Sequence, residues 1–136
     1  MNILDHIKVN KISSIESEGG SIHKILCHAE NSFKGFGEVY TSSIKKDAIR
    51  AWKYHEKMTL NLTILSGKVQ FVFSDGIGHF KLFLLDSNDL FRLTVPPNIW
   101  YGFKGQQNSI ILSLTNIIHD EKEIRRKNIN EIIFDW

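Results

Sequence analysis

The sequence predicts an all-β protein with a single domain, and three observations lead to this. Short apolar segments recur about every 8–12 residues with turn residues between them, which is typical of a β-sandwich or barrel. Apolar and polar residues alternate in several segments, most clearly in Phe91-Arg92-Leu93-Thr94-Val95. A chain of 136 residues can bury one core, so we expect residues 1–136 to form one domain. Periodicity alone leaves a jelly roll and an immunoglobulin-like sandwich both open.

Turn residues divide the chain into its expected elements. The Gly19-Gly20 turn places the first regular strand at about Ser21. The expected strands are 21–26, 36–44, 49–55, 60–65, 69–73, 77–84, 91–95 and 110–114. We predict that the turns at 45–47 and 66–68 each close a hairpin. Residues 120–130 are expected to contain a short helical segment with a polar surface formed by Glu121, Glu123, Arg125 and Arg126.

Composition limits the classes of partner that the protein is expected to bind and the cellular compartment in which it is expected to occur. The 17 basic and 15 acidic residues give a net charge of +2, which is too balanced to indicate a nucleic-acid-binding surface. No apolar run approaches the ~20 residues of a membrane span, so no membrane partner is expected. Cys27 is the single cysteine, and we expect it to be a buried thiol in a soluble protein of the reducing cytoplasm.

The stretch from Ile49 to Phe73 combines two strands with a cluster of ionisable side chains. In a regular strand, Lys53 and His55 share one face and Arg50 lies on the opposite face, unless a bulge changes the alternation. The turn at Ser66-Gly67-Lys68 follows the second apolar strand.

The stretch resembles the first sequence motif of the cupins, and 96–101 resembles the second. His55 and Gly67 have the spacing of the first motif, with Lys53 at its first histidine and Leu60 at its glutamate. In the second motif, Asn98 replaces the glycine and Tyr101 replaces the histidine. The resemblance implies a cupin double-stranded β-helix, which is a jelly roll. Because only His55 remains at a ligand position, we expect no metal site of the cupin type.

Five segments occur in a characteristic order along the chain: Gly37-Glu38-Val39-Tyr40, Arg50-Ala51-Trp52-Lys53-Tyr54-His55, Leu65-Ser66-Gly67-Lys68-Val69, 95–103 and Phe134-Asp135-Trp136. Through these segments the chain resembles, among the cupins, the dTDP-4-dehydrorhamnose 3,5-epimerase family most. The resemblance implies an epimerase or isomerase of a nucleotide-linked sugar, such as a dTDP-sugar, in surface polysaccharide biosynthesis. It also implies a homodimer and a reaction without a cofactor.

The family's reaction removes a proton beside a sugar C4 ketone, which requires a base, an acid and a group that stabilises the enolate. By resemblance, the family's catalytic histidine falls on Lys53, and its catalytic tyrosine falls in 112–118, which contains no tyrosine. Arg50 keeps the position near the substrate's diphosphate. The catalytic candidates are therefore His55 and Lys53, with Tyr101 as a proton donor or relay in contact with the sugar.

Each candidate also has a structural interpretation. His55 could hydrogen-bond inside the barrel, and a buried Lys53 would need an acidic partner or an anionic ligand. Trp52, Tyr54 and Trp100 could bind substrate by stacking or could fill a core or dimer contact. The departures from the family pattern leave a second function open: a non-catalytic cupin that binds a nucleotide sugar or related carbohydrate. A third, a metal-dependent cupin enzyme, would need ligands from outside the two motifs.

Overall fold

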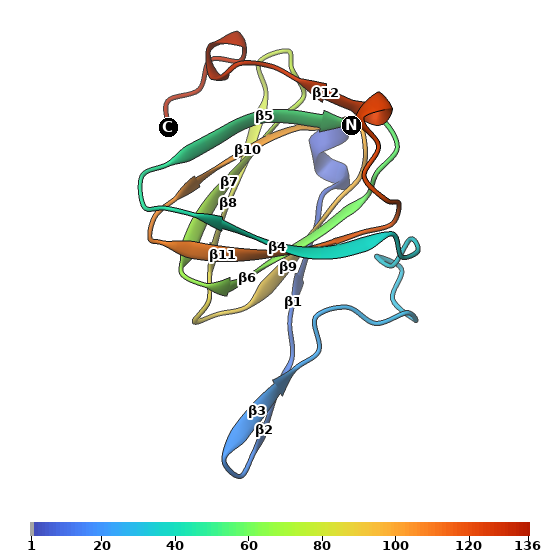
Figure 1. The fold of residues 1–136 in the computed structure, drawn as a ribbon, viewed down its shortest axis with the longest axis vertical. Helices are drawn as coiled ribbons and strands as arrows, with labels where there is room; N and C mark the ends of the chain where they lie inside the picture. Colours follow the sequence, from blue (N-terminus) through green and yellow to red (C-terminus); the bar gives the residue numbers. More distant parts are fainter. Residues whose placement is uncertain (1) are drawn as a thin grey trace.

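The computed structural model describes residues 2–136 and consists of two five-stranded antiparallel sheets that face each other, as Figure 1 shows. The strand orders are β1-β9-β6-β11-β4 and β12-β5-β10-β7-β8, and β2 and β3 form a separate pair. The strands are β1 (Lys8–Lys11), β2 (Ser14–Ser17), β3 (Gly20–His23), β4 (Glu38–Ile44), β5 (Ile49–His55), β6 (Leu60–Ser66), β7 (Lys68–Ser74), β8 (Phe80–Asp86), β9 (Phe91–Val95), β10 (Trp100–Gly105), β11 (Ser109–Thr115) and β12 (Ile124–Arg126). Three short 3-10 turns complete it: η1 (Ile3–His6), η2 (Glu121–Glu123) and η3 (Ile129–Glu131).

The all-β jelly roll prediction is confirmed, but both predicted hairpins are wrong. Strands β4 and β5 lie in different sheets, and so do β6 and β7, whereas β7 and β8 pair as neighbours. The turns at 45–47 and 66–68 therefore carry the chain from one sheet to the other. Period-two alternation identifies a strand but does not name its hydrogen-bonded partner.

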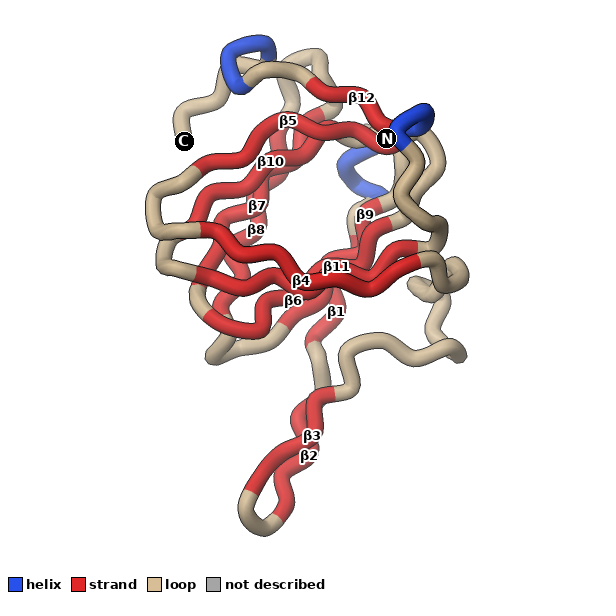
Figure 2. Tube along the Cα trace, in the orientation of Figure 1, coloured by secondary structure: helices blue, strands red, loops and turns tan. Residues whose placement is uncertain are grey.

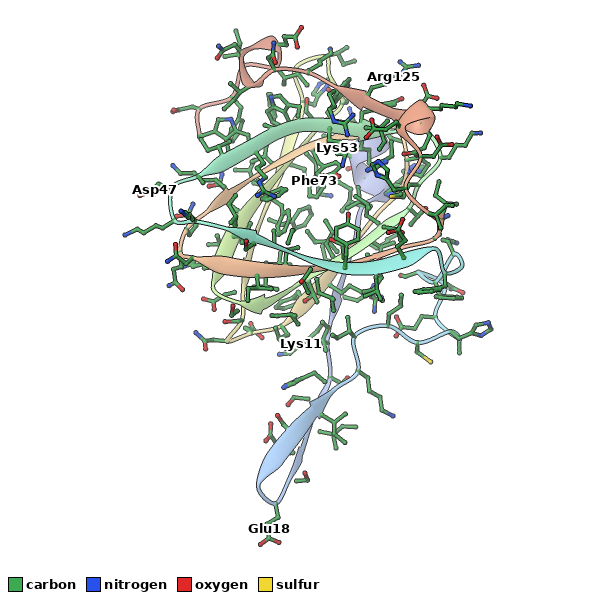
Figure 3. All side chains as sticks on the ribbon, viewed as in Figure 1. Lys11, Glu18, Asp47, Lys53, Phe73 and Arg125 are labelled. Carbon is green, nitrogen blue, oxygen red and sulfur yellow. The ribbon has the colours of Figure 1, made fainter. Side chains whose placement is uncertain are left out.

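The main core fills the space between the two sheets. Strand β6 contributes Leu60, Leu62 and Ile64, and β7 contributes Phe71 and Phe73, all of which are buried. Figure 3 shows Phe73 and Lys53 directed into the interior of the barrel. Each such apolar side chain contributes about 1.5–3 kcal/mol when it is fully buried, so the inward faces of these strands hold the sheets together.

The N-terminal region begins its strands earlier than predicted. Strand β1 (Lys8–Lys11) pairs with β9, and the β2–β3 hairpin projects away from the barrel, as Figures 1 and 2 show. Every residue of these three strands is exposed, so their sequences lack the alternation that reveals a half-buried strand. Cys27 is also exposed, contrary to the expectation of a buried thiol.

The segment 120–130 does not form one helix. It is divided into η2, β12 and η3, and β12 pairs antiparallel with β5. Glu123 is buried rather than part of a polar surface, because η2 turns its side chain toward β5. None of the helices in the described residues is long and apolar enough to cross a membrane.

Substitution of Gly67 tests the crossover between the sheets. Its φ of +90° is unfavourable for L side chains, and an added Cβ would lie 2.1 Å from Ser109 Oγ. We expect Gly67→Ala to lower the free energy of unfolding by about 2–4 kcal/mol in urea titrations. Gly20→Ala is the control, because that Cβ would meet nothing within 4 Å, and its effect should stay below about 0.5 kcal/mol. Equal effects would contradict this account.

Candidate functional site

A bulge in β5 brings Arg50 to the same cavity as Lys53. Lys53 is opposite Tyr101 and Ala51 is opposite Gly102, so Trp52 has no partner on β10. The extra residue changes the alternation, and both cationic side chains line the cavity. The expectation that Arg50 and Lys53 face opposite sides of a regular strand is therefore wrong, because the bulge places both on the same side.

The cavity between the two sheets has a volume of about 180 Å³. Its floor is apolar, whereas its polar lining comes from Tyr40, Ser42, Arg50, Lys53, Tyr101 and Ser113. Drug-sized ligands occupy pockets of about 300–1,000 Å³, so this space is suited to one small ring. A more open pocket of about 380 Å³ shares Tyr40 and Lys53 with the cavity and adds His55 and His119.

His55 is held between a carboxylate and a phenol. Its Nδ1 lies 2.5 Å from Glu123 Oε2, and its Nε2 lies 3.3 Å from the Tyr101 hydroxyl. Glu123 also accepts hydrogen bonds from the backbone N–H groups of Lys57 (3.1 Å) and Met58 (2.9 Å). An ionised carboxylate only accepts, so we assign the Nδ1 proton to a bond to Glu123, which leaves Nε2 to accept from Tyr101.

The surroundings of His55 in the hydrogen-bonded series Glu123–His55–Tyr101 favour its neutral imidazole form. Burial lowers the pKa of His55, and the hydrogen bond to Glu123 and its charge only partly oppose that effect. Burial alone would raise the pKa of Glu123, but the bonds from His55 and two backbone N–H groups outweigh it and keep the pKa low. Burial raises the pKa of Tyr101 well above its usual value. Near pH 7 this series therefore consists of an ionised Glu123, a neutral His55 and a protonated Tyr101.

Lys53 is half-buried beside the hydrogen-bonded side chains of His55 and Tyr101. Burial lowers the pKa of its ammonium, and the charge of Arg126 adds to the effect. Glu121 and Glu123 act in the opposite direction, without reversing the shift. Its amine is therefore more easily deprotonated than that of a solvent-exposed lysine.

The other predicted substrate-binding residues lie on the outer face of β5 and β10. Trp52 is only 2% exposed and packs with Trp136 at a ring-centroid distance of 5.2 Å. The Tyr54 ring lies against Trp100, and its hydroxyl donates to Asn98 Oδ1 at 2.9 Å. Trp52, Tyr54 and Trp100 line neither the cavity nor the more open pocket.

Trp52 joins the bulge to the C-terminal segment. Its backbone N–H donates to Lys127 O at 2.9 Å, and its carbonyl accepts from Lys127 N at 3.1 Å. Its indole N–H donates to the carbonyls of Ile132 (3.1 Å) and Ile129 (3.3 Å). These bonds fix the point at which the strand changes its alternation, and so they fix the direction of its neighbours.

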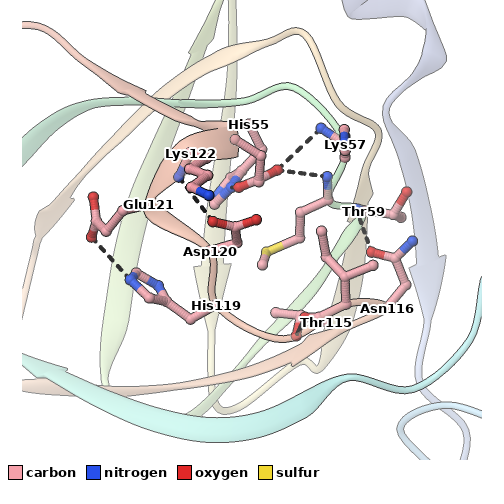
Figure 4. A network of polar contacts seen from close by, with 12 residues as sticks. His55, Lys57, Thr59, Thr115, Asn116, His119, Asp120, Glu121 and Lys122 are labelled. Carbon is pink, nitrogen blue, oxygen red and sulfur yellow. Dashed lines mark hydrogen bonds and ion pairs between the residues drawn. The ribbon is translucent and has the colours of Figure 1, made fainter.

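His119 lines the more open pocket, and Figure 4 shows it with Asp120, Glu121 and Lys122 in a network of polar contacts. His119 Nε2 lies 2.9 Å from Glu121 Oε1, and its backbone N–H donates to Glu38 Oε1 at 2.6 Å. Arg126 makes two hydrogen bonds to Glu121. The bonds draw this segment across from β12 toward β4. Among residues 2–136, no group of three or more His, Cys, Asp or Glu side chains is arranged to hold a metal ion.

Two site residues were not identified from the sequence. Glu123 had no local signal, because its partner His55 is 68 residues away. Tyr40 did have one, since it alternates with Ser42 and Ile44 along β4 and so faces inward with them. Tyr40 provides a phenol at the cavity from the sheet opposite Lys53.

Comparisons with known proteins agree with this architecture. The family model described as FdtA: WxcM-like, C-terminal matches residues 5–131. A dTDP sugar isomerase from Desulfovibrio desulfuricans G20 has a TM-score of 0.88 and 26% identity, over 97% of this chain and 91% of that chain. No curated protein shows significant similarity to the chain.

Two more distant crystal structures share the fold. QdtA, a sugar 3,4-ketoisomerase from Thermoanaerobacterium thermosaccharolyticum in complex with TDP, has a TM-score of 0.80 and 21% identity, over 95% of this chain and 93% of that chain. The dTDP-4-dehydrorhamnose 3,5-epimerase from Sulfolobus tokodaii has a TM-score of 0.85 and 15% identity, over 96% of this chain and 80% of that chain. The predicted resemblance to epimerase-like cupins is confirmed.

Removal of the Glu123 charge should change the titration of His55. The carboxylate raises the pKa of His55 against the effect of burial, so Glu123→Gln should move that pKa further down. The shift can be measured by NMR titration of the His55 ring protons. Glu121→Gln is the matched control, because its carboxylate bonds to His119 and Arg126 instead. An unchanged or higher His55 pKa in Glu123→Gln would contradict the assigned pairing.

The role of Trp52 in holding the bulge can be tested with Trp52→Phe. This variant leaves two backbone carbonyls without their indole donor, and we expect a loss of about 1–3 kcal/mol in free energy of unfolding. Trp100→Phe is the control, since its indole N–H has no protein partner within residues 2–136. If the two variants lost equal stability, the indole hydrogen bonds would not be what holds the bulge.

Proposed function

Because the chain belongs to the family described as FdtA, WxcM-like C-terminal domains, we propose that it is an isomerase or epimerase of a nucleotide-linked 4-keto sugar. The similarity to the dTDP sugar isomerase of Desulfovibrio desulfuricans supports this class of substrate, since it extends over nearly the whole of both chains. QdtA was crystallised in complex with TDP, which supports a nucleoside diphosphate as the second half of the ligand, attached to the sugar.

One observation carries the proposal: a hydrogen-bonded chain from Glu123 through His55 to Tyr101 ends at a cavity that also holds Lys53. Enolisation of a ketone needs a base at the adjacent C–H and a proton donor or cation at the ketone oxygen. Neutral His55 provides the base, with the Tyr101 hydroxyl as the relay to the cavity. Lys53 provides the cation or proton at the oxygen.

The size of the cavity indicates which part of the substrate would lie inside it. The cavity has room for a single sugar ring, which Tyr101 would contact, and the nucleotide would lie outside it. Arg50 is exposed at the same cavity, where its guanidinium would bind the diphosphate. The returned proton can enter from a different side, because Tyr40 and Tyr101 line the cavity from opposite sheets.

The proposal extends to the cellular context that the family resemblance implies. The protein would act in the cytoplasm on a dTDP-sugar destined for surface polysaccharide, without a metal cofactor. Both ring nitrogens of His55 already have partners in the protein, which supports acid–base work over metal ligation. A homodimer is part of the proposal, since an isolated two-stranded hairpin such as β2–β3 is marginally stable without a packing partner.

Deuterium exchange tests the proposed reaction. The protein is incubated in D2O with TDP-4-keto-6-deoxyglucose, and NMR should show deuterium entering the carbon beside the ketone. We expect His55→Asn and Lys53→Met each to slow this exchange by roughly 10²-fold or more, as the loss of an acid–base group does. His23→Asn is the control, because His23 is exposed on the β2–β3 hairpin. Its rate should equal that of the unmodified protein.

Two other outcomes would be decisive. If no 4-keto sugar exchanges but the ligand raises the melting temperature, the protein is a non-catalytic binder of nucleotide sugars. If exchange depends on a stoichiometric metal found by elemental analysis, the metal-independent mechanism is wrong.

A further inference from the structure

The surroundings of Lys53 are unusual for a half-buried ammonium. Among residues 2–136, its side chain forms no salt bridge with a carboxylate. The cavity it lines has an apolar floor formed by Leu60, Leu62, Phe71, Phe103 and Ile111. A charged amine here loses hydration without gaining an ion pair, which favours the neutral form.

The cationic groups around Lys53 favour the same neutral form. The guanidinium of Arg50 shares the cavity, and that of Arg126 belongs to β12, where it is the register partner of Lys53. A lysine that is desolvated or placed beside another cation is a recognised form of activated amine nucleophile. Glu121 and Glu123 oppose this effect, but Glu121 bonds to Arg126 and Glu123 bonds to His55. The pKa of Lys53 is lowered, in agreement with its surroundings.

We propose that the Lys53 amine forms a covalent imine with the ketone carbon of the sugar. This inference rests on the proposed function, which supplies the carbonyl substrate, and deepens it by changing how the negative charge is stabilised. Lys53 and Tyr101 are register partners on adjacent antiparallel strands, where Cβ atoms are about 4.5–5.5 Å apart. Both side chains line the cavity, so a nucleophile and a proton donor lie at the same wall.

The reaction is balanced with water as its only co-reactant. The neutral amine nitrogen attacks the carbonyl carbon, so the C–N bond forms as the π bond of the carbonyl breaks, and the oxygen takes a proton that Tyr101 passes on from solvent. The nitrogen of the resulting carbinolamine is cationic. One of its N–H protons passes to the hydroxyl, which leaves as water, and a protonated imine remains. The adjacent C–H is then more acidic, and its proton passes through the Tyr101 hydroxyl to His55, which gives an enamine. Return of a proton to the carbon that lost it, from either face, restores the protonated imine. Addition of water then releases the ketone at its original carbon, the neutral amine and the proton taken up at the start.

This arrangement gives each group one task. The cationic imine stabilises the charge that builds up when the C–H bond breaks, so no separate cation is needed at the oxygen. His55 stays the base, and Glu123 holds it in the tautomer that leaves Nε2 free to accept. An amine that acts only by acid–base transfer would never bond to carbon, which is the difference that an experiment can detect.

The test is reductive trapping of the full-length protein. The protein is treated with TDP-4-keto-6-deoxyglucose and sodium cyanoborohydride, and intact mass is measured before peptide mapping. We expect one adduct, whose mass is that of the substrate less one oxygen atom, on the peptide that contains Lys53. Lys53→Arg should lose the adduct, and Lys45→Arg, at an exposed turn lysine, should keep it. Peptide mapping of the unmodified protein gives the site even if Lys53→Arg folds poorly.

Deuterium exchange run on the same samples separates this inference from the proposed function. Exchange together with an adduct on Lys53 supports both. Exchange without any adduct overturns the imine and leaves the isomerase or epimerase in place. Absence of both exchange and adduct overturns the two together. Adducts spread over Lys45 and other exposed lysines, and undiminished in Lys53→Arg, also overturn the imine.

Discussion

The buried carboxylate of Glu123 is the interaction on which the site depends. Isolated burial of a carboxylate is costly, and this side chain is 2% exposed. Its cost is offset by three hydrogen bonds, from the His55 ring and from the N–H groups of Lys57 and Met58. Those donors belong to the end of β5 and the loop that follows it, so the carboxylate fixes both against η2. A hydrogen bond to a charged group contributes about 1.5–3 kcal/mol, so the loss of any one of these donors would weaken the arrangement as a whole.

The same C-terminal segment also fixes the other half of the site. Residues 127–132 hold Trp52 through its backbone and its indole, on the outer side of β5. On the inner side, the bulge at Trp52 is what brings Arg50 to the cavity of Lys53. The outer apolar cluster of Trp52, Trp100, Ile132 and Val72 therefore affects the cavity through the direction of its neighbours on β5, because neither tryptophan lines the cavity. A strand pinned on both faces holds its charged side chains with little freedom.

Lys53 occupies the position at which the epimerase resemblance places a histidine, and the structure explains how the site tolerates the change. Its side chain lines the cavity together with apolar side chains and two phenols, those of Tyr40 and Tyr101. The neighbouring His55 is retained in a neutral, oriented form. An oriented imidazole therefore remains two residues from the position at which the resemblance places the family's histidine.

The sequence by itself determined the all-β class, the positions of most barrel strands and the cluster of Lys53, His55 and Tyr101. These features follow from local patterns: period-two alternation, turn glycines, and an Asn98 that adopts a positive φ of 71° where the family has glycine. Tertiary structure alone decided which strands pair, the face on which Arg50 lies and the burial of Glu123. Alternation reports which side chains are buried, but a bulge or a change of sheet depends on packing between segments far apart in the chain. The contact between His55 and Glu123 spans 68 residues and exists only because β12 pairs with β5.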